Sequence, residues 1–203
     1  NTVYIPRKEI YCLWHTRASI LLDNRMREVC RVYCRTQNSV DNLCQKSAMS
    51  KYVLGIDPGY ARLGWAVLDI GEREPRLVVC GCIETDKNEK HEIRLSFIAS
   101  EVRGLFEKYH PTKLVIEKLL FTKNQTTGIA VAESRGVVLA IAGALRCVVE
   151  EVGPKQVKLS VAGYGNADKQ QVQEMVKRLL NLPEVPKPDD AADACAIALS
   201  CVH

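Results

Sequence analysis

Four acidic residues stand at positions where a folded protein usually avoids charge. Asp57 ends the apolar run of "KYVLGIDPG" and enters a Pro-Gly turn, and Glu117 interrupts the apolar run of "LVIEKLL". Asp190 and Asp193 are three residues apart in "PDDAADACAIAL", so a helix beginning there would carry both on one face of its first turn. Burial of an unpartnered carboxylate is costly, and four that converge repel one another unless a cation lies between them.

A shared metal site is the chemistry that these residue types predict together. Each carboxylate alone has an ordinary explanation, because an Asp can stabilise a turn or cap a helix and a strand Glu can pair with a base. We assign the ordinary capping role to the neighbouring Asp189. Oxygen donors suit hard divalent ions, and two such ions can activate water and stabilise a leaving oxygen in phosphodiester hydrolysis. The expected ligands of two Mg²⁺ ions, which Mn²⁺ can replace, are Asp57, Glu117, Asp190 and Asp193.

The apolar patterns predict the elements that must position these residues. Asp57 and Glu117 belong to strands that can be neighbours, and Asp190 and Asp193 begin a helix that can pack beside them. Three strands followed by alternating helices and strands indicate an α/β domain with a mixed sheet. Strands are expected at 51–57, 63–69, 77–84, 113–121 and 148–154, and helices at 90–109, 126–147, 168–181 and 190–202.

Residues 1–48 differ from the remainder of the chain in charge and pattern. They hold eight Lys or Arg and four Asp or Glu, and so carry the whole net charge of +4, whereas residues 49–203 hold twenty of each sign. They show no strand alternation, and Met49 comes directly before the first strand pattern. We therefore expect one domain over 49–203 and a loosely structured extension over 1–48, upstream of the true start at Met49. An alternative for the extension is a zinc site built from Cys12, His15, Cys30 and Cys34.

The composition excludes several classes of protein. The chain has no run of about eighteen apolar residues, and its first residues lack the pattern of a secretory signal, so we expect a cytoplasmic protein without a membrane span. Its nine cysteines are scattered through apolar segments, as expected of small buried side chains and not of a disulfide framework. Because residues 49–203 carry no net charge, a nucleic-acid partner must bind a local basic face.

The four segments "GIDPG", "LVIEKLLF", "KQVKLSVAGYGNADKQQV" and "DDAADACAIAL" occur in the order and with the spacing of a known family. The chain resembles the RuvC-type Holliday junction resolvases of the RNase H-like superfamily over residues 51–203, and the third segment is the most specific part. The resemblance implies an RNase H-like fold, a five-stranded mixed sheet flanked by helices on both faces. It also implies a homodimer that resolves four-way DNA junctions in recombination and repair by paired Mg²⁺-dependent nicks with 5′-phosphate ends, working with a branch-migration helicase complex.

The resemblance also assigns roles to individual residues. It makes the four carboxylates catalytic metal ligands, and it places Lys158 and Lys169 beside the scissile backbone, where two lysines can stabilise developing charge. Leu120 departs from the family, which commonly has an aromatic there, and the adjacent Phe121 is either the substitute that stacks on junction bases or a core side chain. The residues expected to contact DNA are Lys158, Lys169, Phe121, Lys123 and Arg135.

The long helix expected over 126–147 bears on the oligomeric state. It is apolar nearly all round, and a single sheet face does not cover such a helix, so we expect burial between the sheet and a second subunit. The alternative is a central core helix of a monomer. Rival functions are another RNase H-like nuclease that acts on RNA, a junction-binding protein that does not cleave, and an actin-like ATPase. The ATPase would need a second domain, for which the chain is too short.

Overall fold

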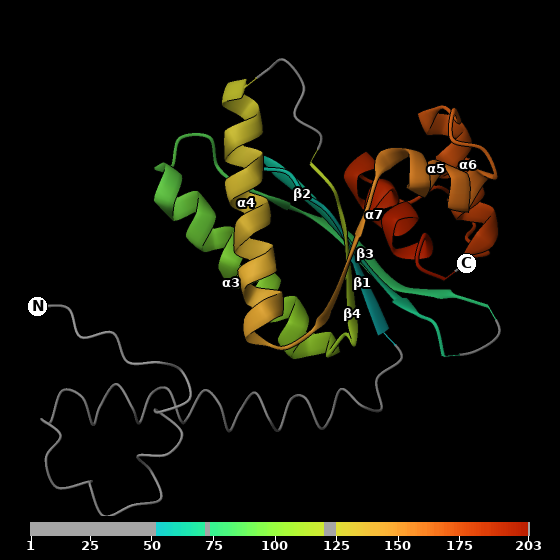
Figure 1. Ribbon diagram of the computed structural model, residues 1–203, viewed down its shortest axis with the longest axis horizontal. Coiled ribbons are helices and arrows are strands. Elements are labelled where there is room, and N and C mark those ends of the chain that lie inside the picture. The colour runs from blue at the N-terminus through green and yellow to red at the C-terminus, as the bar shows by residue number, and fades with distance from the viewer. Residues whose placement is uncertain (1–51, 72–73, 120–124, 203) are drawn as a thin grey trace, which may run out of the picture. The chain divides into compact units, whose positions relative to one another are not determined.

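The computed structural model describes residues 52–71, 74–119 and 125–202 (Figure 1). All of them belong to one structural unit, Leu43–His203. The extension over 1–48, with its alternative zinc ligands, lies outside the described residues, as do Phe121 and Lys123. The elements are β1 (Tyr52–Asp57), β2 (Arg62–Asp69), β3 (Arg76–Glu84), α3 (His91–Tyr109), β4 (Lys113–Glu117), α4 (Gln125–Ala144), β5 (Val148–Val152), α5 (Pro154–Ala162), α6 (Lys169–Leu179) and α7 (Asp189–Leu199).

The five strands form one mixed sheet in the order β3-β2-β1-β4-β5, which confirms the predicted α/β class. The β1–β2 and β2–β3 pairs are antiparallel, and the β1–β4 and β4–β5 pairs are parallel. The register places Ile56 opposite Ile116, so the next residues, Asp57 and Glu117, end adjacent strands at the same edge. Side chains alternate between the two faces of a strand, which directs both carboxylates to one face.

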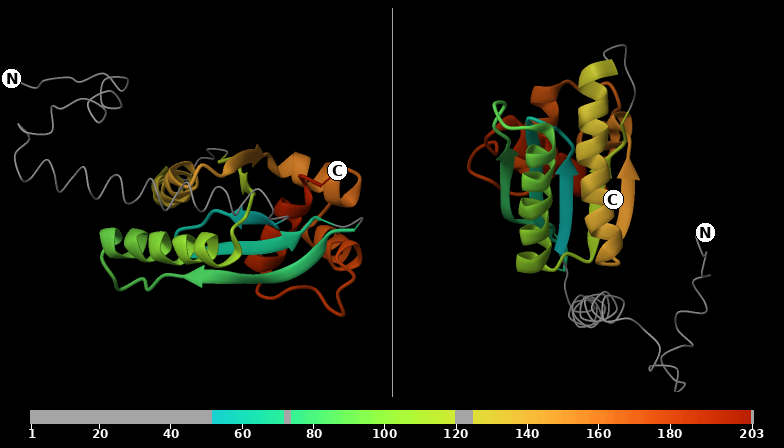
Figure 2. Two further views of the ribbon diagram at one scale, coloured as in Figure 1. Left: turned by 90° about the horizontal axis from the view of Figure 1, so that it is seen from below. Right: turned by 90° about the vertical axis from the view of Figure 1, so that its left-hand side faces the viewer.

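Helices cover both faces of the sheet, as predicted (Figures 1 and 2). On one face the buried side chains of Val53 and Val115 pack with those of α5, α6 and α7. On the other face Leu54 and Ile116 pack with α3 and α4. Because Asp57 and Glu117 follow the alternation of Val53 and Val115, their carboxylates lie on the face that α7 covers.

Two glycines let α7 lie unusually close to the sheet. A Cβ atom at Gly64 would lie 2.0 Å from the backbone oxygen of Asp190, and one at Gly55 would lie 2.4 Å from that of Ala194. Any larger residue at these positions of β1 and β2 would displace the first turns of α7. The glycines therefore determine how near the acidic start of α7 comes to the strand that ends at Asp57.

The structure differs from the sequence predictions at several element ends. Strand β4 ends at Glu117, short of the predicted residue 121, and α4 ends at Ala144 because Arg146 adopts a left-handed conformation with φ of 53°. The prediction that Asp189 caps α7 is wrong. Pro188 occupies the N-cap position without a side-chain hydrogen bond, and Asp189 is the first residue inside the helix.

Helix α5 is absent from the sequence prediction, although its signals are readable. Pro154 stands at the first helical position, where its fixed φ is favourable, and Gly163 ends the helix in a left-handed conformation. Val157 and Val161, four residues apart, form its buried side. No helix in the described ranges is long and apolar enough to cross a membrane.

Candidate active site

Asp57, Glu117 and Asp193 line a common pocket of about 220 Å³ where β1, β4 and α7 meet. Lys158 of α5 and Lys169 of α6 line the same pocket. Strands β1 and β4 finish at their carboxylates, Lys169 is the first residue of α6, and Asp193 lies just beyond the first turn of α7. The remaining lining residues are Pro154, Val157, Val172, Ala196 and Ile197.

The environment of Asp57 opposes ionisation. Burial, followed by the charges of Glu117, Asp193 and Asp190, raises the pKa of the Asp57 carboxyl from 3.8 to about 7, and Lys169 counters part of this rise. Burial and the charge of Asp193 also raise the pKa of Glu117. Carboxyl groups that perturb one another in this way lie close enough to interact, and a pocket of this kind binds a cation favourably.

Two cationic side chains of the chain itself neutralise the acidic start of α7. Arg62, the first residue of β2, contacts Asp190 with an Nη2–Oδ2 distance of 2.7 Å. Lys169 contacts Asp193 with an Nζ–Oδ2 distance of 3.0 Å and Asp189 with one of 3.3 Å. Burial raises the pKa of Asp193 and Lys169 opposes that rise. Asp190 is thus turned toward Arg62 and does not line the pocket, although its charge reaches Asp57.

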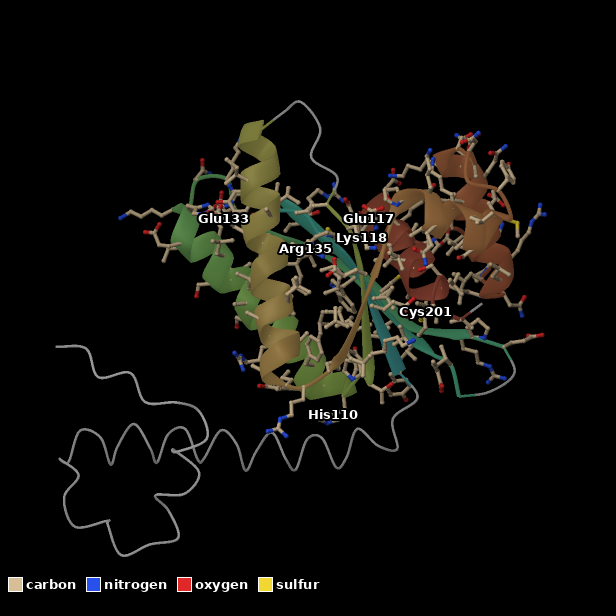
Figure 3. All side chains as sticks on the ribbon, in the orientation of Figure 1. His110, Glu117, Lys118, Glu133, Arg135 and Cys201 are labelled. Carbon is tan, nitrogen blue, oxygen red and sulfur yellow. The ribbon has the colours of Figure 1, made fainter. Side chains whose placement is uncertain are left out.

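The residues expected to contact DNA have separate surroundings. Lys158 and Lys169 lie at the pocket, where a phosphate could approach both. Arg135 is largely buried: its Nε donates to the backbone oxygen of Glu117 at 3.2 Å, and its Nη2 bonds the Glu151 carboxylate of β5. Figure 3 shows Arg135 extending from α4 toward the end of β4. Its described partners are therefore protein groups beside the pocket.

The donor chemistry of the site fits a hard divalent ion. Its acidic members offer only carboxylate oxygens, which are the ligands that such ions prefer. Burial and the charges of neighbouring carboxylates raise the pKa of Asp57 and Glu117, and a bound cation would offset both. Within the described residues, no three His, Cys, Asp or Glu side chains are already gathered around one point. The three aspartates of α7 are instead turned toward cations of the chain: Asp190 contacts Arg62, and Asp189 and Asp193 contact Lys169.

Residues 53–201 match the family model described as "Crossover junction endodeoxyribonuclease RuvC". The chain belongs to this family. Curated RuvC relatives include that of Roseiflexus sp. (strain RS-1), 47% identical over 72% of this chain and 87% of the relative, and that of Thermotoga maritima, 46% identical over the same shares. The chain is accordingly a crossover junction endodeoxyribonuclease of the RNase H-like fold, as the sequence motifs predict.

Solved structures support the RuvC assignment through the fold. The RuvC of Thermus thermophilus, solved in complex with a Holliday junction substrate, superposes with a TM-score of 0.71 at 33% identity. The match covers 74% of this chain and 92% of that one. The similarity therefore extends over the sheet, the flanking helices and the elements that line the pocket.

Sequence reasoning misses two residues at this site. Arg62 begins β2, two residues before Gly64, and the local sequence gives no sign of an acidic partner 128 positions away. Asp189 is predicted to cap the helix, but its carboxylate contacts Lys169. Both contacts depend on where α7 and α6 begin in space, which the local pattern does not specify.

Proposed function

We propose that this RuvC family member cleaves four-way DNA junctions by paired nicks, with Asp57, Glu117, Asp190 and Asp193 binding Mg²⁺ or Mn²⁺. The observation that carries the proposal is the pocket in which Asp57, Glu117 and Asp193 face Lys158 and Lys169. The carboxylates of this pocket suit metal ions, and its lysines suit a phosphodiester. Family membership supports the junction as substrate, and so does the similarity to the Thermus RuvC that was solved with a Holliday junction.

The proposed hydrolysis follows from the residues that line the pocket. Bound divalent ions supply Lewis acidity that makes water a nucleophile and neutralises charge on the phosphate. A bond forms between water oxygen and phosphorus while the P–O3′ bond breaks, leaving a 5′-phosphate and a 3′-hydroxyl. Lys158 and Lys169 orient the phosphate and stabilise the charge that develops on its oxygens. The raised pKa of Asp57 makes metal binding weaken as the pH falls through about 7, because protons then compete for the carboxylate.

We propose a homodimer that uses the outer face of α4. Gly136, Ala140 and Gly143 are exposed at a spacing of four and three residues, so they lie along one side of the helix, and Ile129 continues this side with 57% of its surface exposed. A Cβ atom at Gly136 or Gly143 would meet nothing within 4 Å. A second copy on this face would give two sites related by a two-fold axis, as two opposed nicks require.

The domain boundary and the helicase partner belong to the same proposal. We assign the nuclease to residues 49–203, which is supported by the family match over 53–201. The proposal that the chain works with a branch-migration helicase complex rests on family resemblance alone.

Cleavage of synthetic DNA tests the function. The purified chain should nick a mobile four-way junction symmetrically with Mg²⁺ and leave ligatable ends, and EDTA should stop the reaction. Asp57→Asn should still bind the junction without cutting it. Equal cutting of linear duplex, or no cutting with Mg²⁺ or Mn²⁺, would contradict the proposal.

The mass of Ala140→Arg in solution tests the dimer face: this variant should be monomeric where the parent is dimeric.

A further inference from the structure

Two consecutive residues of α4 bond backbone groups at or just after the ends of the strands that carry Asp57 and Glu117. Ser134 bonds the oxygen of Gly59 in the turn after β1, and Arg135 bonds the oxygen of Glu117. We propose that Ser134 and Arg135 are positioning residues, which hold those two carboxylates at the separation that a metal ion needs. The inference rests on the proposed role of Asp57 and Glu117 as ligands. It adds a mechanical role for α4, which lies on the opposite face of the sheet from the pocket.

Ser134 makes an unusual contact for a serine within a helix. Such a hydroxyl commonly bonds a carbonyl of the preceding turn of its own helix. The Oγ of Ser134 instead donates to the backbone oxygen of Gly59 at 2.8 Å, and the side chain is fully buried. Gly59 lies two residues after Asp57, and Pro58 between them has no N–H to offer. The hydroxyl therefore anchors the turn that immediately follows the carboxylate.

The same turn is held from its other side. Thr85 donates twice, from Oγ1 to the oxygen of Tyr60 at 2.8 Å and from its backbone N–H to the oxygen of Ala61 at 3.0 Å. Together with the Ser134 contact, three successive carbonyls of the turn are bound. Glu133 reaches the turn indirectly, because its carboxylate contacts His91 Nε2 at 3.0 Å and His91 Nδ1 lies 2.8 Å from the Tyr60 hydroxyl.

Arg135 anchors the end of β4, as Ser134 anchors the turn that follows β1. Its Nε donates to the backbone oxygen of Glu117 itself, and its Nη2 bonds Glu151 on the adjacent strand β5. Successive helix residues point about 100° apart, so one turn of α4 can reach two neighbouring strands. Ser134 bonds the oxygen of Gly59, two residues after Asp57, and Arg135 bonds the oxygen of Glu117. The two side chains therefore act on the pocket through the backbone beside each carboxylate and bond neither carboxylate.

Metal binding without DNA gives the direct test. The affinity for Mn²⁺ is measured by titration at pH 8, above the pKa of Asp57. Loss of a residue that orients a ligand typically weakens metal binding roughly 10- to 100-fold. We expect Ser134→Ala to raise the Kd for Mn²⁺ at least about 10-fold and Ser134→Cys, which keeps a weaker donor, to fall between it and the parent.

Ser200 offers a matched control. It is also buried, 3% exposed, and its Oγ also donates to a backbone oxygen, that of Ile197 at 2.7 Å. Ser200→Ala therefore removes the same kind of bond from the far end of α7 and should leave the Kd for Mn²⁺ within about two-fold. An equal effect of Ser134→Ala and Ser200→Ala would overturn the inference, since the change would then reflect a general loss of stability. Thermal unfolding of each variant accompanies the titration.

Arg135→Met distinguishes a positioning role of Arg135 from a direct contact with DNA. It also tests the inference if the Ser134 variants do not fold. We expect it to weaken Mn²⁺ binding about 10-fold in the absence of DNA. Arg103→Met, which removes an exposed arginine of α3, is the control and should not weaken Mn²⁺ binding. A junction-binding defect with unchanged Mn²⁺ affinity would show that Arg135 contacts DNA only and would overturn its assignment. Unchanged Mn²⁺ binding in Asp57→Asn would overturn the metal assignment, and the inference with it.

Discussion

Replacing Asp57 with asparagine should stabilise the metal-free protein while it abolishes cleavage. The carboxylate is buried next to Glu117 and Asp193, and this environment raises its pKa to about 7. An asparagine has nearly the same shape and no charge to desolvate or repel. The proposed metal site should therefore lower the stability of the fold whenever no metal is bound.

The size of the effect follows from the pKa of Asp57 in the folded and unfolded chain. Between pH 3.8 and about 7 the folded protein holds a proton on Asp57 that the unfolded chain has lost, so stability falls as the pH rises. At ~1.4 kcal/mol per pH unit, asparagine should increase the free energy of unfolding by ~2 kcal/mol at pH 5 and ~4 kcal/mol at pH 8. The value at pH 8 is an upper limit, because Glu117 and Asp193 ionise more readily once Asp57 is neutral.

Urea unfolding in EDTA at pH 5 and pH 8 measures both differences. Asp69→Asn is the matched control: Asp69 is also half-buried, but it lies at the opposite end of the β1–β2 ladder, paired with Tyr52. This control should show no comparable gain between the two pH values. Added Mn²⁺ should stabilise the parent and not Asp57→Asn, since only the parent keeps the ligand. A gain that does not grow with pH, or no gain at pH 8, would refute the electrostatic reasoning.

Three further predictions follow from other contacts. Gly64→Ala should lower the free energy of unfolding by at least ~1–3 kcal/mol and raise the Mg²⁺ concentration needed for cleavage, because its Cβ would lie 2.0 Å from the Asp190 backbone oxygen. Urea unfolding and cleavage assays measure both effects. Gly104→Ala, whose Cβ would lie in open space on α3, is the control. Lys169→Met should raise the pKa of Asp57 further and move the pH dependence of Mn²⁺ binding upward, an effect that titrations at several pH values would show or exclude. Asp168→Ala removes the capping box of α6 and should cost ~1 kcal/mol in urea unfolding; an unchanged midpoint would contradict this.

The sequence predicts most of the fold because period-two and helical patterns are local. The apolar run 52–57 is β1, and alternation from Val53 places Asp57 on the face that α7 covers. Helix α4 shows the limit of such patterns. It is apolar nearly all round, so its sequence does not tell which residues face the sheet. The bonds of the Arg135 guanidinium to the backbone oxygen of Glu117 and to the Glu151 carboxylate could not be predicted from it, and the predicted DNA contact of Arg135 stays a prediction. Contacts of this kind depend on the rotation of one helix about its axis.

The four carboxylates divide into two pairs by the way their charge is balanced. Asp190 and Asp193, on α7, are already paired with Arg62 and Lys169 through partly exposed ion pairs, which contribute little stability and are exchanged readily. Among the described residues neither Asp57 nor Glu117 makes an ion pair, and α4 bonds the backbone oxygen of Glu117 and that of Gly59, two residues after Asp57. Asp57 and Glu117 would therefore be the carboxylates most readily available to a divalent ion, and Asp190 and Asp193 would become available only when Arg62 and Lys169 release them. Once released, Arg62 and Lys169 would be able to bind the substrate phosphate, so the cations that balance the α7 aspartates would also hold the substrate.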